Sequence, residues 1–194
     1  MRLRVTAMFG APARPLTEGM TRNDTIAGTV LGAATVATAL IAGAFYIFAC
    51  AVMPALARSD DRVFVDVMRD INDVIQNPVF LLGFLGALVL TGVSAWQLRA
   101  RPYRWWVWGA LVAYGLAFLV TVAFNIPLNN GLTEAGAPSA LREEFEDPWV
   151  AWNVVRAVLS TVAVGCLGRA LVGYGRITGG AVGRRSAPSS TSGV

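Results

Sequence analysis

Three residues in the last apolar stretch of the chain have the types and spacing of a polar binding site. Trp149, Asn153 and Arg156 follow the i, i+4, i+7 pattern of a single helical face. An arginine inside such a stretch usually has a function, and because its guanidinium keeps its proton, Arg156 must be paired, hydrated or available to an anion. A structural salt bridge is one explanation, and its candidate partners are Asp66, Asp70, Asp73, Glu143, Glu144 and Glu146.

Asparagines near the ends of other apolar stretches are further candidates for this site. Asn125 and Asn129 lie four residues apart and share a helical face if the helix continues past Pro127. A proline within a membrane span leaves a backbone carbonyl without its N–H donor, so a polar neighbour must donate a hydrogen bond to that carbonyl. Asn72 borders the apolar face of a shorter amphipathic segment. Alternatively, each asparagine caps a helix or bonds to water or backbone at the membrane interface.

Four charge-poor stretches must position these residues. Residues 25–57, 74–98 and 105–133 contain no charged residue, and residues 148–174 contain two arginines. Each stretch is longer than the roughly 20 residues that cross a hydrocarbon core of about 30 Å. A composition of 55% hydrophobic and 14% charged residues is likewise too apolar for a soluble domain of 194 residues. The sequence therefore predicts an all-α integral membrane four-helix bundle.

The boundaries of the bundle follow from the same stretches. The four spans are expected at about residues 26–56, 78–98, 105–128 and 149–173. They form one membrane domain of residues 25–175. Residues 1–24 and 176–194 are rich in small and polar residues and are predicted to be disordered cytoplasmic segments.

Between spans 1 and 2, residues 61–76 are predicted to form an extracytoplasmic amphipathic helix. Charged residues gather on one side of this helix. The opposite, apolar face consists of Phe64, Val67, Met68, Ile71 and Ile75. Such a helix lies flat on the membrane surface or caps the bundle.

All sixteen basic residues are arginines, and their distribution orients the bundle. They are concentrated in the N-terminal segment, in residues 99–104 and in the C-terminal tail, whereas residues 58–73 and 134–147 are predominantly acidic. Because basic loops stay in the cytoplasm, both termini are predicted to be cytoplasmic. We expect a multi-pass protein of the plasma membrane whose partner is the lipid bilayer and not nucleic acid. The sequence is compatible with a monomer and with a homo-oligomer.

Missing residue types exclude several kinds of site. The chain has no histidine, so it cannot form a His-ligated haem, a His-rich zinc or copper site or a Ser-His-Asp triad. Its two cysteines, Cys50 and Cys166, lie in predicted spans and provide no extracytoplasmic disulfide framework. No glycine-rich phosphate loop or dinucleotide-binding fingerprint occurs. We therefore expect no metal site.

Four short motifs, in order along the chain, together resemble one known family. They are Val52-Met53-Pro54-Ala55-Leu56, Met68 with Ile71-Asn72, Asn125-x-Pro127-x-Asn129 and Trp149-x-x-x-Asn153-x-x-Arg156. Over about residues 26–173, the chain resembles the anthrone-oxygenase-like family of small four-span membrane proteins. Much of that family is a domain of unknown function, and some fungal members are implicated in oxygenating anthrones to anthraquinones without a metal or a flavin.

The resemblance implies a cofactor-independent oxygenase, or a binder of an apolar aromatic or phenolic small molecule. On this reading Arg156 and Asn153 are the catalytic residues, and the Arg156 guanidinium stabilises an oxyanion on the substrate. A carboxylate near the pocket mouth would act as the general base, and its candidates are Glu143, Glu144 and Asp147.

The same reading assigns the substrate-binding residues and the cofactor requirement. Asn72, Asn125 and Asn129 would hydrogen-bond the carbonyl or phenol oxygens of the substrate. Trp149 or Trp152 would stack on its ring. Because the implied reaction uses neither metal nor flavin, no cofactor is expected.

Two functions of other classes stay open. In the first, the protein is a noncatalytic membrane subunit in which the same polar residues lock the outer end of the bundle. In the second, it is a small transporter in which Arg156 captures an anionic or carbonyl-bearing solute. Four spans without an inverted repeat make a monomeric transporter the least favoured of the three functions.

Overall fold

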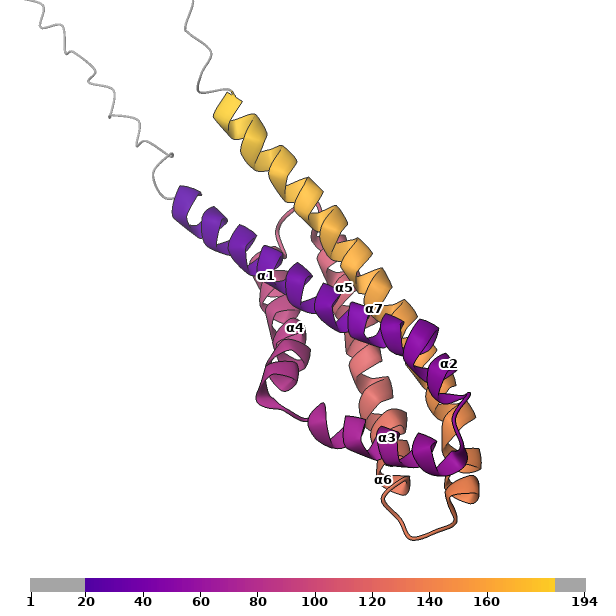
Figure 1. Cartoon of the computed structure of the whole chain (residues 1–194). Coiled ribbons are helices and arrows are strands. Elements are labelled where there is room, and N and C mark those ends of the chain that lie inside the picture. Colours follow the sequence, from indigo (N-terminus) through magenta and orange to yellow (C-terminus); the bar gives the residue numbers. More distant parts are fainter. Residues whose placement is uncertain (1–19, 184–194) are drawn as a thin grey trace, which may run out of the picture.

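Helices account for all regular secondary structure in residues 20–183, which are the part of the chain that the computed structural model describes (Figure 1). Four helical stretches are long and apolar enough to cross a membrane, namely Arg22–Leu56, Pro78–Gln97, Arg104–Gly131 and Pro138–Thr178. The predicted all-α bundle with four spans is therefore confirmed.

The elements follow one another through short connections. In chain order they are α1 (Met20–Ile47), the π-helix η1 (Phe48–Val52), α2 (Met53–Leu56), α3 (Asp61–Val74), α4 (Pro78–Gln97), α5 (Arg104–Val120), the π-helix η2 (Thr121–Asn125), α6 (Ile126–Gly131) and α7 (Pro138–Gly183). The first span thus consists of α1, η1 and α2, and the third of α5, η2 and α6.

Two helices extend beyond their expected bounds. α7 begins at Pro138, so most of the acidic segment that the sequence assigned to a loop forms its first turns. Alanine, leucine, arginine and glutamate in this segment are strong helix formers, and Pro148 lies inside the helix instead of starting it. α1 begins at Met20 and α7 continues to Gly183. The remainder of the predicted disordered segments, residues 1–19 and 184–194, lies outside the described residues.

Each of the two π-helical segments is followed by one residue and then a proline, Pro54 after η1 and Pro127 after η2. Proline has no N–H and interrupts the i to i−4 hydrogen bonds of an α-helix. The wider π-helical turn keeps the backbone hydrogen-bonded before the proline, because the N–H of Met53 donates to the carbonyl of Phe48. An equivalent bond closes η2. Both helices therefore continue through their prolines with a bulge of the kind often found at functional sites.

The membrane part of the bundle is held together by small and apolar side chains between α1, α4, α5 and α7. Its fully buried large members are Leu31, Leu98, Val107, Tyr114 and Leu167. Helices α1 and α7 run side by side (Figure 1), and Gly28 of α1 lies against the ring of Tyr174. A Cβ at Gly28 would come within 2.6 Å of that ring, so glycine allows the two helices to approach closely.

A second apolar cluster closes one end of the bundle, where α3 lies across the ends of the spans (Figure 1). Its buried members are Met53, Phe64, Val65, Met68, Leu132, Phe145 and Trp149. The side chain of Asp60 caps α3 by accepting a hydrogen bond from the N–H of Val63 at 3.0 Å. The amphipathic helix expected between spans 1 and 2 is therefore present, and it caps the bundle.

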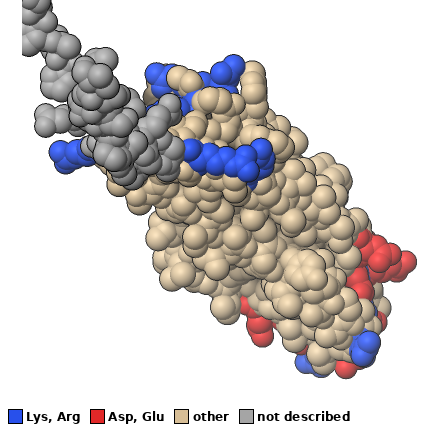
Figure 2. Space-filling model, turned by 90° about the horizontal axis from the view of Figure 1, so that it is seen from above, with Lys and Arg blue, Asp and Glu red and all other residues tan. Residues whose placement is uncertain are grey.

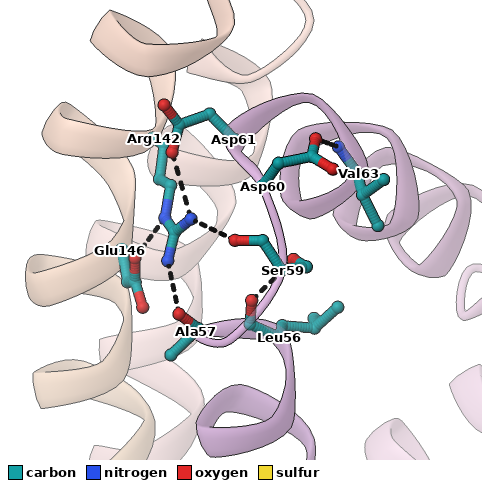
Figure 3. A network of polar contacts seen from close by, with 8 residues as sticks. All are labelled: Leu56, Ala57, Ser59, Asp60, Asp61, Val63, Arg142 and Glu146. Carbon is teal, nitrogen blue, oxygen red and sulfur yellow. Dashed lines mark hydrogen bonds and ion pairs between the residues drawn. The ribbon is translucent and has the colours of Figure 1, made fainter.

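Arginine side chains fasten α3 to its neighbours. Arg142 of α7 donates to the carboxylates of Glu146 at 2.6 Å and Asp61 at 3.0 Å, and to two backbone carbonyls in the segment before α3 (Figure 3). On the other side, Nε of Arg69 in α3 donates to the carbonyl of Leu132 at 2.6 Å. These contacts fix the position of α3 over the bundle.

Charged side chains gather at the two ends of the bundle (Figure 2). Arginines dominate the end at the connection between α4 and α5, where Arg101 forms an ion pair with Asp24. Most acidic residues lie at the opposite end, in α3 and in the first turns of α7. Beside the basic end, Trp96, Trp105 and Trp106 are exposed, as is typical of side chains at a membrane interface.

Candidate functional site

A cavity of about 250 Å³ lies between α3 and the spans, at the end of the bundle that α3 caps. Five aromatic side chains line its wall, namely Phe45, Phe48, Phe80, Phe84 and Trp149, together with several aliphatic ones. Polar side chains interrupt this wall, namely Asn72, Gln76, Thr121, Asn129, Asn130, Asn153 and Arg156. A mostly apolar cavity with a few convergent polar groups is the usual form of a small-molecule site.

Arg156 is the charged residue in this lining, and only 6% of it is exposed. Its guanidinium carbon lies 4.3 Å from the ring centroid of Phe45 and 5.4 Å from that of Trp149, so two aromatic rings contact the cation. Nη2 donates to Oδ1 of Asn153 at 2.9 Å, whereas Nε is buried without a hydrogen-bond partner in residues 20–183. The protein therefore uses only a small part of the donor capacity of this arginine.

The salt bridge considered for Arg156 is absent from the described residues. Asp66 pairs with Arg62 and Arg69 instead, and none of the ion pairs in residues 20–183 includes Arg156. The candidate acidic residues of α3 are exposed and do not line the cavity, and those in the first turns of α7 lie several turns before Arg156. This structural explanation of the buried charge is therefore wrong.

Asn153 connects α7 to α1 and positions the guanidinium. Its side chain is fully buried, and Nδ2 donates to the backbone carbonyl of Phe45 at 3.0 Å. Oδ1 accepts the hydrogen bond from Arg156. Because both ends of this amide are engaged, Asn153 holds one edge of Arg156 in place and has little freedom to turn toward a ligand.

The two asparagines of the third span contact Trp149 from the side of η2 and α6. Nε1 of Trp149 donates to Oδ1 of Asn129 at 2.7 Å, and both residues line the cavity. Nδ2 of Asn125 donates to the backbone carbonyl of Trp149 at 3.5 Å. Asn125 is buried but does not line the cavity, and its Oδ1 has no partner in the described residues. Asn129 thus belongs to the wall, and Asn125 lies behind it.

Asn72 reaches the same cavity from α3. Its Nδ2 is buried and has no hydrogen-bond partner in residues 20–183. The turn that follows α3 adds Gln76, whose Nε2 donates to the backbone carbonyl of Asn72 at 2.8 Å. The structure therefore brings Asn72 together with Asn129, Trp149 and Arg156, although these residues are far apart in the sequence.

Trp152 lies elsewhere. Its ring stacks on Phe124, with ring centroids 3.8 Å apart, and it lines a second cavity of about 360 Å³ between α6 and α7. Glu144 lines this second cavity as well. No carboxylate in the described residues lines the Arg156 cavity, so the residues suggested as general base do not face Arg156.

The aromatic wall contributed by α1, η1 and α4 was not foreseen. Phe84 lies at its centre. The ring centroid of Phe84 is 5.3 Å from that of Phe118, 6.0 Å from that of Phe80 and 6.4 Å from that of Phe45. A signal was available, because Phe80 and Phe84 are four residues apart at the start of an otherwise aliphatic span and therefore share a face.

The site contains donors and rings but no group of metal ligands. Within residues 20–183, no three Cys, Asp or Glu side chains lie close enough together to hold a metal ion. What the arrangement can do is bind a flat apolar molecule and stabilise negative charge on one of its oxygens beside Arg156.

Comparison with known proteins agrees with these residues. The family model described as Anthrone oxygenase matches residues 74–166, from the end of α3 into α7. The matched range includes Asn125, Asn129, Trp149, Asn153 and Arg156. No curated protein and no solved structure matches the chain. The predicted resemblance to the anthrone-oxygenase-like family is therefore confirmed over the region that supplies the buried arginine and most of its polar neighbours.

Proposed function

We propose that this protein binds a small, flat aromatic molecule with a phenolic or carbonyl oxygen in the Arg156 cavity and oxygenates it without a metal or a flavin. The observation that carries the proposal is a buried guanidinium with an unpartnered Nε, in a cavity whose described lining has no carboxylate. Aromatic walls favour a flat ring, and a fixed cation favours an oxygen that becomes negative. The match of residues 74–166 to the Anthrone oxygenase family supports the same class of substrate.

The reaction that fits these groups is the conversion of an anthrone to an anthraquinone. Loss of a proton from the CH2 group of the anthrone places negative charge on its carbonyl oxygen, which Arg156 stabilises. The ring carbon then bonds to O2, and after it takes up a proton the resulting hydroperoxide loses water to leave a second carbonyl. One O2 is consumed and one water is released, so O2 is the sole oxidant.

The proton acceptor in this scheme is water. The chain has no histidine, and the candidate carboxylates Glu143, Glu144 and Asp147 are exposed on the first turns of α7. Turnover is therefore expected to rise with pH as more of the free anthrone ionises. A rate that does not change with pH across the ionisation of the substrate would require a proton acceptor within the site.

We also propose that the protein lies in the plasma membrane with both termini in the cytoplasm, which puts the Arg156 cavity in the outer part of the bilayer. The arginine-rich end supports this orientation, because basic segments stay in the cytoplasm. In a variant without Cys50 and Cys166, a membrane-impermeant thiol reagent added to intact cells should label Asp70→Cys. It should label Arg99→Cys only after permeabilisation, and the reverse result would invert the topology.

The experiment that tests the proposed activity uses the full chain in lipid nanodiscs with anthrone and dissolved oxygen. The wild-type protein should consume one O2 for each anthraquinone formed. Arg156→Lys keeps the charge but loses Nε and the planar donor geometry, so it should fold and insert but lose most of its turnover. Arg62→Lys is the matched control, because its side chain is 84% exposed and outside the cavity. Unchanged turnover in Arg156→Lys would contradict the proposal.

A noncatalytic subunit is the second candidate, and one observation favours it. Asn153 bonds to Arg156 and to the backbone carbonyl of Phe45. These hydrogen bonds connect α7 to α1, as expected for residues that stabilise the packing of the two helices. If locking the bundle is the function, replacing Arg156 should mainly lower thermal stability. Intact stability together with lost ligand binding would instead support the binding site.

A further inference from the structure

Two residues that line the Arg156 cavity carry buried hydrogen-bond donors without a partner in residues 20–183. One is Nε of Arg156 on α7, and the other is Nδ2 of Asn72 on α3. Buried polar groups in folded proteins are almost always hydrogen-bonded, so two unpartnered donors on residues that line one cavity are unusual. Two other amide donors of the lining are engaged: Nδ2 of Asn153 bonds to a carbonyl of α1, and Nε2 of Gln76 bonds to a carbonyl of α3.

Both donors are held in place by the surrounding structure. Asn153 fixes the other edge of the Arg156 guanidinium, and two aromatic rings cover it. α3 is fastened by Arg69 and by the Arg142 contacts, so the backbone of Asn72 has a fixed position over the cavity. Groups that are held in this way, and that can only donate, select a ligand with acceptor atoms at matching positions.

We propose that the ligand of this cavity carries oxygen acceptors at two separate edges, one for Arg156 and one for Asn72, and that Asn72 is a specificity-determining residue. This inference rests on the proposed function and adds the recognition of a second oxygen. An anthrone has a single ring oxygen and leaves one donor unpaired, whereas its oxygenation places a second oxygen at the opposite position of the middle ring. The cavity is then complementary to the oxygenated product and to the oxygen being added.

The test measures binding of three molecules that share one ring system. Anthracene has no oxygen, anthrone has one and anthraquinone has two at opposite edges. Binding to the full chain in lipid nanodiscs is followed under anaerobic conditions by quenching of tryptophan fluorescence, because Trp149 lines the cavity. The wild-type protein should bind anthraquinone about tenfold more tightly than anthrone, as expected for one additional hydrogen bond to a buried donor.

Asn72→Leu removes the donor with little change of shape and should lower the affinity for anthraquinone more than that for anthrone, so that the preference is lost. Gln76→Leu is the matched control, because Gln76 lies four residues further on, in the turn that follows α3, and lines the same cavity, but its donor is already engaged. This variant should keep the preference. Asn72→Ala provides a second variant if leucine disturbs folding, and the same loss of preference is expected.

The outcomes separate this inference from the proposed function. If wild-type protein binds anthrone and anthraquinone equally, or if both Asn72 variants keep the preference, the role of Asn72 is wrong and the proposed function stands. If neither anthrone nor anthraquinone binds more tightly than anthracene to the wild-type protein, Arg156 does not recognise oxygen, and both proposals fail.

Discussion

Two arginines of α7 have opposite relations to the protein around them. Arg142 makes four hydrogen bonds, two to carboxylates and two to backbone carbonyls (Figure 3). Arg156 makes one, to Asn153, and its Nε has no partner in residues 20–183. A helical rise of about 1.5 Å per residue separates the two by roughly 20 Å along the same helix. The fold therefore engages Arg142 in four hydrogen bonds, against the five N–H groups of a guanidinium, and leaves most of the donors of Arg156 available.

The difference shows how a buried charge can be recognised as structural or functional. A buried donor without an acceptor costs roughly 1–3 kcal/mol, and a bound ligand with an oxygen acceptor would offset that cost. Arg142 has no such deficit, because the acidic residues and free carbonyls at the capped end surround it. Position in the sequence does not separate the two cases. The number of engaged donors does.

The largest expected effect is on turnover, in Arg156→Met. Removing a donor that stabilises an oxyanion typically lowers turnover about 100-fold or more. Methionine has a similar length and removes the unpartnered Nε, which offsets the loss of the hydrogen bond to Asn153, so the midpoint of thermal unfolding should change little. Oxygen consumption with anthrone and the unfolding midpoint are measured on the same nanodisc preparation. A lower midpoint with unchanged turnover would put Arg156 in the same structural class as Arg142.

Arg142→Met is the counterpart, and its expected effect is on stability. It leaves the carboxylates of Glu146 and Asp61 without their cation and two carbonyls without a donor. We expect the free energy of unfolding to fall by about 2–4 kcal/mol, with a much smaller change in turnover than in Arg156→Met when both are assayed below the midpoint. Arg62→Met, at an 84% exposed side chain, should change stability by no more than about 0.5 kcal/mol.

Most of the fold could be predicted because it depends on long patterns. Charge-free stretches longer than a bilayer crossing define the spans, and the segregation of charge on residues 61–76 defines α3. The start of α7 could not be placed, because Pro148 carries a strong signal for a helix start and the acidic segment before it has no apolar period.

The site could be predicted only along single helices. The spacing of Trp149, Asn153 and Arg156 places them on one face, and the structure brings all three to the cavity. The aromatic wall from α1 and α4 was missed because spans that are apolar on every side do not reveal which face points inward. The different numbers of hydrogen bonds made by Arg142 and Arg156 depend on contacts between segments that are distant in the sequence, and a local sequence pattern does not show such contacts.

Asn153→Leu sharpens the comparison by removing the one hydrogen-bond partner that Arg156 has in residues 20–183. The change deletes the hydrogen bond to Arg156 and the bond to the carbonyl of Phe45, so stability should fall by about 1–2 kcal/mol. Turnover should fall roughly tenfold, because the guanidinium loses its orientation but keeps its charge. Chemical unfolding and oxygen consumption are the measurements. Turnover as low as in Arg156→Met would make Asn153 part of the reacting site instead of a positioning residue.

The smallest expected effect concerns the charge of Asp61, one of the two carboxylates bound to Arg142. Its oxygen lies 3.0 Å from Nη1 of Arg142, but the side chain is 47% exposed, so solvent screens much of the attraction. Asp61→Asn keeps an oxygen acceptor and removes the charge, which should cost less than about 1 kcal/mol of stability and even less at high salt. Asp66→Asn is the control, because Asp66 is 58% exposed and its contacts to arginines are 3.7 and 3.9 Å long. If Asp61→Asn destabilises the protein as much as Arg142→Met, the Arg142 contacts depend on this one ion pair. The contrast with Arg156 would then be one of charge pairing and not of hydrogen-bond satisfaction.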